Sequence, residues 1–289
     1  MAARITSFIS FSAIMAAIAP AYAQQVQTLE PVAQDAAQEP VFSITPRVTY
    51  TWTNLNVPNT SSSEQVARST FQAPSAGLTV ELRPRGSRFQ YSLTGVYGEG
   101  DGGLYGTNSG LDIGGTYKAK RLDAEGIVRF YPSDLPAYLM VGARYIRFEV
   151  EDRLGGNVVF STTNSNVGNE TIDAGALEIG GGVNGPLSDS LSYFSNAIVG
   201  YGALKAESDT GSHITGGGSD RQYGPMGDMS VGLTYSPVGR DGQGRTTASR
   251  WSASTRYRAT IFPVHYAPDT SSYDFWVTHG LEVNLSLRF

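Results

Sequence analysis

The chain has 289 residues, of which 16% are charged, and its formal net charge is -5 at pH 7. This weak acidity is far from the basic footprint of nucleic-acid-binding proteins, so we expect no DNA or RNA partner. The absence of cysteine excludes disulfides and thiolate metal sites.

The start of the chain has the features of a cleaved secretory signal peptide. Arg4 gives a short positive region, an apolar stretch follows, and Ala21 and Ala23 form a small-x-small cleavage site. The apolar stretch is shorter than the ~20 residues that a membrane-spanning helix needs. We therefore expect residues 1–23 to be removed on export. Residues 24–41, which are rich in Gln, Ala and Pro, are expected to form a disordered leader.

From residue 42 onward, apolar and polar residues alternate over long segments. In the first of them Val48, Tyr50 and Trp52 share one face, while Arg47 and several threonines share the other. A period of two predicts β-strands with one apolar and one polar face. Ten such strands are expected, at Ser43–Thr53, Gly77–Pro84, Phe89–Thr94, Arg121–Tyr131, Tyr138–Arg153, Thr171–Asn184, Leu191–Glu207, Arg221–Val238, Ser249–Val264 and Ser272–Phe289.

The connections between these strands alternate in length. Four are short and turn-like, and five are mostly longer and rich in Ser, Thr, Asn and Gly. The long ones are Leu55–Ser69, Glu99–Lys120, Leu154–Glu170, Ser208–Asp220 and His265–Ser271. Short turns on one side and long loops on the other are typical of a transmembrane β-barrel.

The predicted fold class is therefore all-β, an antiparallel transmembrane β-barrel of ten strands, with eight or twelve as alternatives. A secreted soluble β-sandwich or propeller would also alternate, but its aromatic-rich faces would need a partner sheet. The count is least certain at Gly110–Lys120, which alternates but slips in phase against the next strand. We interpret the slip as a bulge in one long strand, because an extra hairpin would make the count odd.

The last nine residues, LEVNLSLRF, alternate up to the final carboxylate. With the signal sequence ending in IAPAYA, this segment resembles the bacterial outer-membrane β-barrel class, whose final strand closes on an aromatic residue. The resemblance covers residues 42–289 and identifies no subfamily; position 287 is leucine where many members place another aromatic. The residues that would form the assembly signal are Leu281, Val283, Leu285, Leu287 and Phe289.

This resemblance implies a location in the cell outer membrane, with the leader in the periplasm. It implies insertion by the barrel-assembly machinery, which recognises the last strand. The partners that we expect in the mature state are outer-membrane lipids and lipopolysaccharide.

Nine charged residues fall on the inward, polar faces of the proposed strands, five of them cationic and four anionic. In a narrow lumen this near-balance predicts mutual pairing, because an unpaired buried charge is costly. We expect the charges to plug the lumen rather than to line a conducting path. This predicted lumen charge network consists of Arg47, Glu81, Glu125, Arg129, Arg144, Glu178, Arg256, Arg258 and Glu282.

No HExxH, GxSxG or P-loop motif and no zinc-spaced cluster is present, so we expect neither an enzyme nor a cofactor. The expected role is structural or surface-interacting, through long extracellular loops whose ligand the sequence does not identify. One alternative is a narrow channel for small solutes. Another is a surface hydrolase resembling the omptin proteases, with Asp209 and His213 as the candidate couple and Asp101 alone on the opposite wall.

Overall fold

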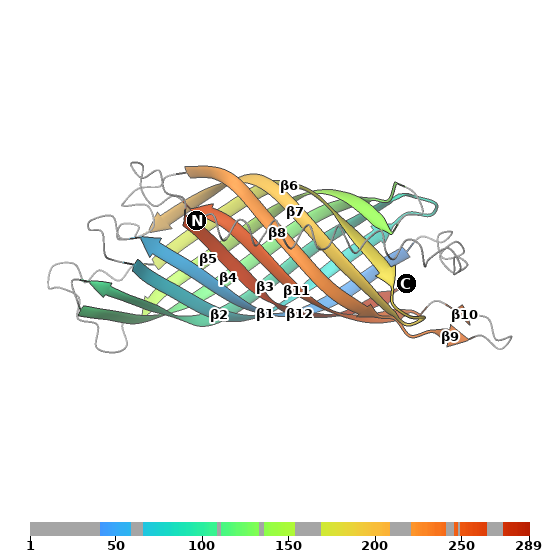
Figure 1. The fold of residues 1–289 in the computed structure, drawn as a ribbon, viewed down its shortest axis with the longest axis horizontal. Helices are drawn as coiled ribbons and strands as arrows, with labels where there is room; N and C mark the ends of the chain where they lie inside the picture. The colour runs from blue at the N-terminus through green and yellow to red at the C-terminus, as the bar shows by residue number, and fades with distance from the viewer. Residues whose placement is uncertain are drawn as a thin grey trace. The chain divides into compact units, whose positions relative to one another are not determined.

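A computed structural model describes residues 41–58, 66–108, 111–132, 136–153, 169–208, 221–240, 246–247, 249–264 and 274–289. Ten long antiparallel strands close on themselves into a barrel, in the order β1-β12-β11-β8-β7-β6-β5-β4-β3-β2 (Figure 1). The predicted ten-stranded antiparallel barrel is confirmed. In the part of the chain that is described, no helix is long and apolar enough to cross a membrane.

The strand bounds are β1 Val41–Pro58, β2 Val66–Arg83, β3 Phe89–Asn108, β4 Leu111–Phe130, β5 Ala137–Arg153, β6 Asn169–Pro186, β7 Leu191–Ser208, β8 Arg221–Tyr235, β11 Trp251–Val264 and β12 Asp274–Arg288. A small hairpin of β9 Gly239–Arg240 and β10 Thr246–Thr247 lies between β8 and β11 in sequence. The first strand starts at Val41, one residue before the predicted start of the barrel.

The first and last strands close the barrel. β1 pairs with β12 from Ser43–Arg288 to Asn54–Val277. At the very end of the chain, the Phe289 N–H donates to the carbonyl of Phe42 at 2.9 Å, and the two rings lie 6.2 Å apart. The aromatic terminus therefore packs on the seam that completes the cylinder.

The strands are strongly staggered. Phe42 on β1 has a register partner on β2, which has a partner on β3, and so on around the barrel. Followed through all ten strands, this line of partners returns to β1 at Asn54, twelve residues further along. At ~3.3 Å per residue and ~4.8 Å between strands, this stagger corresponds to a tilt of about 40°. The strands run obliquely around the axis accordingly (Figure 1).

The two faces of the wall have inverted polarity compared with a soluble protein. Large apolar side chains are exposed on the outside, for example Leu177 at 74%, Leu93 at 66% and Val48 at 64%. On the inside Thr53 and Asp228 are almost completely buried. Alternation along each strand produces this arrangement, because successive side chains point to opposite faces.

Two sets of aromatic side chains border the apolar outer face. The set at the end that carries the C-terminus is Phe42, Phe89, Phe130, Tyr235, Trp251 and Phe289. The set toward the opposite, far end is Tyr50, Trp52, Tyr97, Tyr145, Tyr201 and His279. Phe42 and Trp52 are ten residues apart on β1, which corresponds to about 25 Å of height at this tilt.

Two sequence predictions about the β3–β4 region were wrong. The predicted long loop Glu99–Lys120 is strand on both sides of residues 109–110, and Asp101 lies in β3, paired with Gln72 of β2. The predicted bulge is absent, because β4 pairs without interruption with both β3 and β5.

The phase slip has another cause. Arg121 and Ala119 lie on the same inner face of β4, and both are buried. The lumen is charged around Arg121 and apolar around Ala119. The inner face therefore changes from charged to apolar within one unbroken strand, and the sequence pattern shifts with it.

Candidate functional site

The alternation of the strands points nine predicted charged residues into the lumen, where each is buried or half-buried. They come from seven strands. Arg47 lies on β1, Glu81 on β2, Glu125 and Arg129 on β4, Arg144 on β5, Glu178 on β6, Arg256 and Arg258 on β11, and Glu282 on β12.

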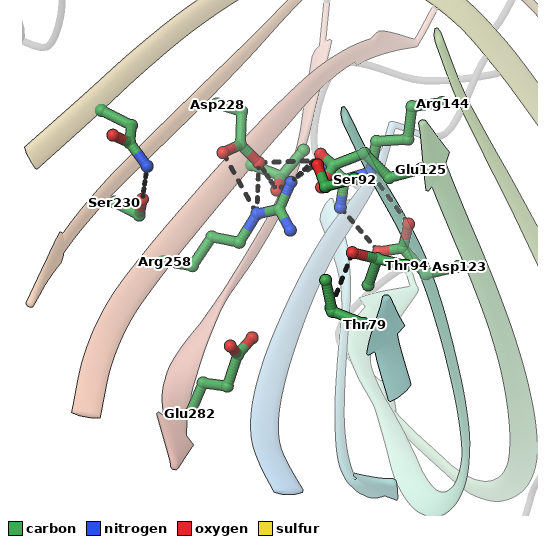
Figure 2. A network of polar contacts seen from close by, with 12 residues as sticks. Thr79, Ser92, Thr94, Asp123, Glu125, Arg144, Asp228, Ser230, Arg258 and Glu282 are labelled. Atoms are coloured by element: carbon green, nitrogen blue, oxygen red, sulfur yellow. Dashed lines mark hydrogen bonds and ion pairs between the residues drawn. The ribbon is translucent and has the colours of Figure 1, made fainter. Parts of the chain in front are cut away.

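Five charged residues form a central cluster in the lumen (Figure 2). Arg258 donates from Nη2 to Glu125 Oε1 at 2.6 Å and from Nε to Asp228 Oδ2 at 2.8 Å. Arg144 donates from Nη1 to the same Asp228 oxygen at 2.8 Å and from Nη2 to Asp123 Oδ2 at 2.6 Å. Asp228 thus links the two guanidinium groups, and the cluster joins β4, β5, β8 and β11.

The contact between Arg258 and Glu125 crosses the lumen. Four strands separate β11 from β4 in either direction around the barrel, so the two strands face each other. Side chains from opposite walls therefore meet directly. Because charge-assisted hydrogen bonds of this length are strong and geometrically specific, the contact ties the two walls together.

A second group lies on β1, β11 and β12. Arg47 donates from Nη1 to Glu282 Oε1 at 2.9 Å, and Arg256 donates from Nη2 to Glu282 Oε2 at 2.8 Å. The Nε of Arg256 lies 2.8 Å from Oε1 in an ion pair without hydrogen-bond geometry. One carboxylate therefore serves two arginines. A third, separate pair joins Arg129 to Glu81 at 3.3 Å.

Sequence reasoning missed three members of the lumen charges. Asp228 on β8 and Arg121 on β4 were not singled out, and Asp123 was placed on the inner face of its strand but left out of the network. The sequence pattern could have identified Asp228. Val231 and Leu233 lie on the outer face of β8, so strict alternation places position 228 on the inner face. With these three, the lumen charge network consists of six arginines and six carboxylates.

Glu178 stands apart from these pairs. Its side chain is 3% exposed, and neither carboxylate oxygen has a hydrogen-bond partner. A buried carboxylate without a partner is unusual, since desolvation of the charge is not compensated. The predicted pairing of charges therefore does not extend to Glu178.

Apolar clusters flank the charges on both sides. Toward the end that carries the C-terminus, Ile127, Tyr138, Met140 and Ile198 pack together. Toward the far end, the larger cluster is Ala73, Ala119, Ile146, Phe148, Ile172, Ala174, Leu204, Met226 and Phe262. The guanidinium of Arg121 lies 5.6 Å from the centre of the Phe148 ring and connects the charged and apolar layers.

A cavity of about 30 Å³ lies where the charged and far-end apolar layers meet. Arg144 lines its floor, and Ile146, Leu204, Met226 and Phe262 line its sides. The remaining lining residues are Ala174, Gly175, Ala176, Gly202, Ala203, Tyr223, Gly224 and Pro225. The cavity stays unfilled because several of these lining positions that face inward carry only glycine or alanine.

Several sequence candidates fall outside the described residues. These are the cleavage residues Ala21 and Ala23, and the hydrolase candidates Asp209 and His213. No group of three or more His, Asp or Glu side chains that could hold a metal ion occurs in the ranges that the structure describes. The five alternating residues of the final strand all lie exposed on the outer face, which leaves them free to contact an apolar surrounding.

No protein-family model matches the chain, and no curated protein matches its sequence. Among solved structures it is similar to the translocator domain of the autotransporter NalP from Neisseria meningitidis, at 13% identity over 98% of both chains with a TM-score of 0.44. It is also similar to the outer membrane protease OmpT from Escherichia coli, at 9% identity over 91% of this chain and 99% of that one, with a TM-score of 0.47.

A third similar structure is Ail, the attachment invasion locus protein of Yersinia pestis, solved with the heparin analogue sucrose octasulfate. The identity is 10% over 87% of this chain and 100% of that one, and the TM-score is 0.33. These neighbours are outer-membrane β-barrels with different activities, so the likeness concerns the barrel fold and carries no assignment of activity.

Proposed function

We propose that the chain is an integral outer-membrane β-barrel with a closed lumen, and that its role is structural or surface-interacting rather than catalytic. The observation that carries this proposal is the 2.6 Å contact of Arg258 with Glu125 between opposite walls. A solute passing along the lumen would have to separate buried ion pairs, and breaking such a pair costs several kcal/mol.

The outer face supports the membrane position. The apolar band between the two aromatic sets is about as tall as the ~25 Å band of outer-membrane barrels, where amphipathic aromatic rings favour the interfaces. Just beyond the far-end set, Arg147 pairs with Glu149 at 3.0 Å and lies 3.9 Å from Asp173 on the outside of the wall. Charged groups at that height suit the lipid headgroup region.

We infer lipids and lipopolysaccharide as the partners of this outer face, and the barrel-assembly machinery as the partner of the last strand during insertion. The exposed residues Leu281, Val283, Leu285, Leu287 and Phe289 support the second inference, because they offer one uninterrupted apolar edge beside the closing seam.

One observation favours a second candidate, a narrow cation-preferring channel. Glu178 is a buried carboxylate without a hydrogen-bond partner on the lumen side of β6. A cation moving along that wall would find an acceptor there that no arginine occupies. The closed barrel is preferred because the carboxylates of the central cluster, Asp123, Asp228 and Glu125, are all bound to arginines.

Solute leakage from proteoliposomes tests the proposal. Vesicles that contain the refolded protein should retain a small sugar as well as protein-free vesicles do. An Arg144→Ala, Arg258→Ala double variant should leak, whereas Arg147→Ala, on the outer face, should not. Rapid leakage through the unaltered protein would refute the closed lumen, and its reduction by Glu178→Gln would establish the channel instead.

A further inference from the structure

The barrel wall has an unpaired seam between β8 and β11. Their pairing begins at Ala253–Tyr235 and ends at Ile261–Gly227. Both strands continue toward the far end, where their backbone is described: β8 reaches back to Arg221 and β11 runs on to Val264. Among these described residues, no pair joins the two strands beyond Ile261–Gly227.

Two prolines account for the unpaired seam. By register Pro225 of β8 would face Pro263 of β11. The Arg288 N–H donates to the carbonyl of Arg250, and the Ser236 N–H donates to the carbonyl of Ser190. Because backbone groups alternate in direction along a strand, the odd-numbered residues of β8 and β11 direct theirs toward each other, so the missing N–H of both prolines falls on the β8–β11 side. Proline cannot donate to a ladder and is normally confined to edges. Both strands therefore behave as edges at this point.

The seam starts at the height of the far-end aromatic set. Following the stagger of the strands, Gly227 lies about 20 Å and Pro225 about 25 Å above the level of Phe42. Gly227 belongs to the outward face, and a Cβ added there would meet no heavy atom within 4 Å. The outer surface is thus bare where the pairing stops.

The cavity lies directly inside this seam. Met226 and Phe262, the first inward residues beyond the last pair, both line it, and Ile146 and Leu204 complete its apolar sides. Its floor is Arg144, which is held by Asp228 at 2.8 Å. A volume of about 30 Å³ has room for about two water-sized groups, such as the end of an alkyl chain.

We propose that the β8–β11 seam is a lateral entrance through which the end of an alkyl chain passes from the outer leaflet into this cavity. The chemistry favours such a chain: the sides of the cavity are apolar, the seam begins at the upper edge of the apolar band, and the charged floor stops further passage. The chain belongs either to a membrane lipid or to a free hydrocarbon-like molecule. This inference rests on the proposed membrane position but not on the closed lumen.

Photolabelling tests the entrance. The refolded protein is placed in vesicles that contain a phospholipid with a diazirine at the end of one acyl chain, and the labelled residues are mapped by mass spectrometry. A second arm uses a free diazirine-bearing fatty acid. Labelling of Ile146, Met226 or Phe262, which face the lumen, is the expected result, and the arm that produces it identifies the source. Labels confined to outward residues in both arms would overturn the proposal.

A disulfide lock tests the route. Gly227→Cys with Ile261→Cys joins the last pair of the seam, and Leu78→Cys with Gly95→Cys joins a paired, outward position on β2 and β3. Paired positions have Cα separations that suit disulfides, and the chain has no cysteine of its own. The seam lock should abolish lumen labelling until it is reduced, and the control lock should not. Labelling that survives the seam lock would assign entry to the barrel ends.

A second pair of variants tests the same route without a disulfide, in case the locked protein folds poorly. Gly227→Trp should block the seam from outside and lose lumen labelling. Gly95→Trp adds the same bulk at another outward glycine with nothing within 4 Å of its Cβ, so its labelling should be unchanged. Equal labelling of both variants would contradict the lateral route. The leakage measurement stays informative in either case, because sugar retention does not depend on the seam.

Discussion

Arg258 and Glu125 meet at 2.6 Å although they belong to strands on opposite sides of the barrel. The two side chains are only 16% and 9% exposed, and Arg258 also binds Asp228. Buried ion pairs of this kind add little or no stability over an apolar packing, but removal of one partner leaves an uncompensated charge. The lumen is therefore expected to tolerate the loss of a cross-barrel partner poorly.

Substitution of Arg258 tests this expectation. Arg258→Ala leaves Glu125 and Asp228 each without one of its guanidinium partners, and we expect the free energy of unfolding to fall by about 3–5 kcal/mol. Urea unfolding of the refolded protein in lipid vesicles measures the change. Arg147→Ala is the matched control, because its ion pairs are about 40% exposed on the outer face and should contribute no more than ~1 kcal/mol. Equal losses in the two variants would contradict the difference in burial.

Two glycines on neighbouring strands should respond differently to alanine. A Cβ at Gly77 would lie 2.3 Å from the carbonyl oxygen of Gly95, so Gly77→Ala must shift backbone and should destabilise the barrel by more than ~1 kcal/mol. Gly95 itself has open space around its Cβ position, and Gly95→Ala should be neutral or slightly stabilising. Unfolding midpoints of the two variants check this, and the reverse order would be evidence against the close strand approach.

The sequence was sufficient to predict which face of a strand enters the lumen, because a period of two needs no knowledge of neighbours. Arg47 and Glu282 were assigned inward on that basis alone. Which arginine reaches which carboxylate was not predictable, since the answer depends on stagger and closure. Arg258 and Glu125 are 133 residues apart in sequence and meet only when ten tilted strands close.

The far-end wall was hardest to predict. The stretch from Glu99 to Lys120 reads as a loop because it is rich in glycine and its alternation appears out of phase. Above the apolar band, a membrane in the proposed position would no longer cover the outer face, and the inner face becomes apolar, as at Ala119. The usual rule of apolar outside and polar inside therefore fails there for a physical reason. The unpaired seam at Pro225 also required the register of β8 against β11.

The membrane position predicts where tryptophan fluorescence is quenched. Trp52 and Trp251 belong to the two aromatic sets about 25 Å apart in height, so both should lie near a headgroup region. In single-tryptophan variants that also carry Trp276→Phe, lipids brominated near the headgroup should quench both residues more strongly than lipids brominated at the chain ends. Stronger quenching by the chain-end bromines would place these tryptophans in the membrane interior and contradict the proposed position of the apolar band.

Removal of the last residue should impair assembly. Phe289 donates to Phe42 across the closing seam and is 72% exposed on the outer face. Without it we expect a lower yield of protein in the outer membrane, measured against total synthesised chain. Leu187→Ala, which changes an exposed apolar residue of the β6–β7 turn, serves as the control and should leave the yield unchanged. Normal yield after deletion of Phe289 would remove the assembly role of the final strand.

Single-channel recording of the refolded protein in planar bilayers tests the closed lumen most directly. The folded state is first established by the shift of its band on heating in an SDS gel. We predict no steady conductance from the unaltered barrel at neutral pH, and discrete openings from Arg258→Ala combined with Glu125→Ala. Steady conductance from the unaltered protein, altered by Arg256→Ala with Glu282→Ala, would contradict the account and make the charged lumen a pathway.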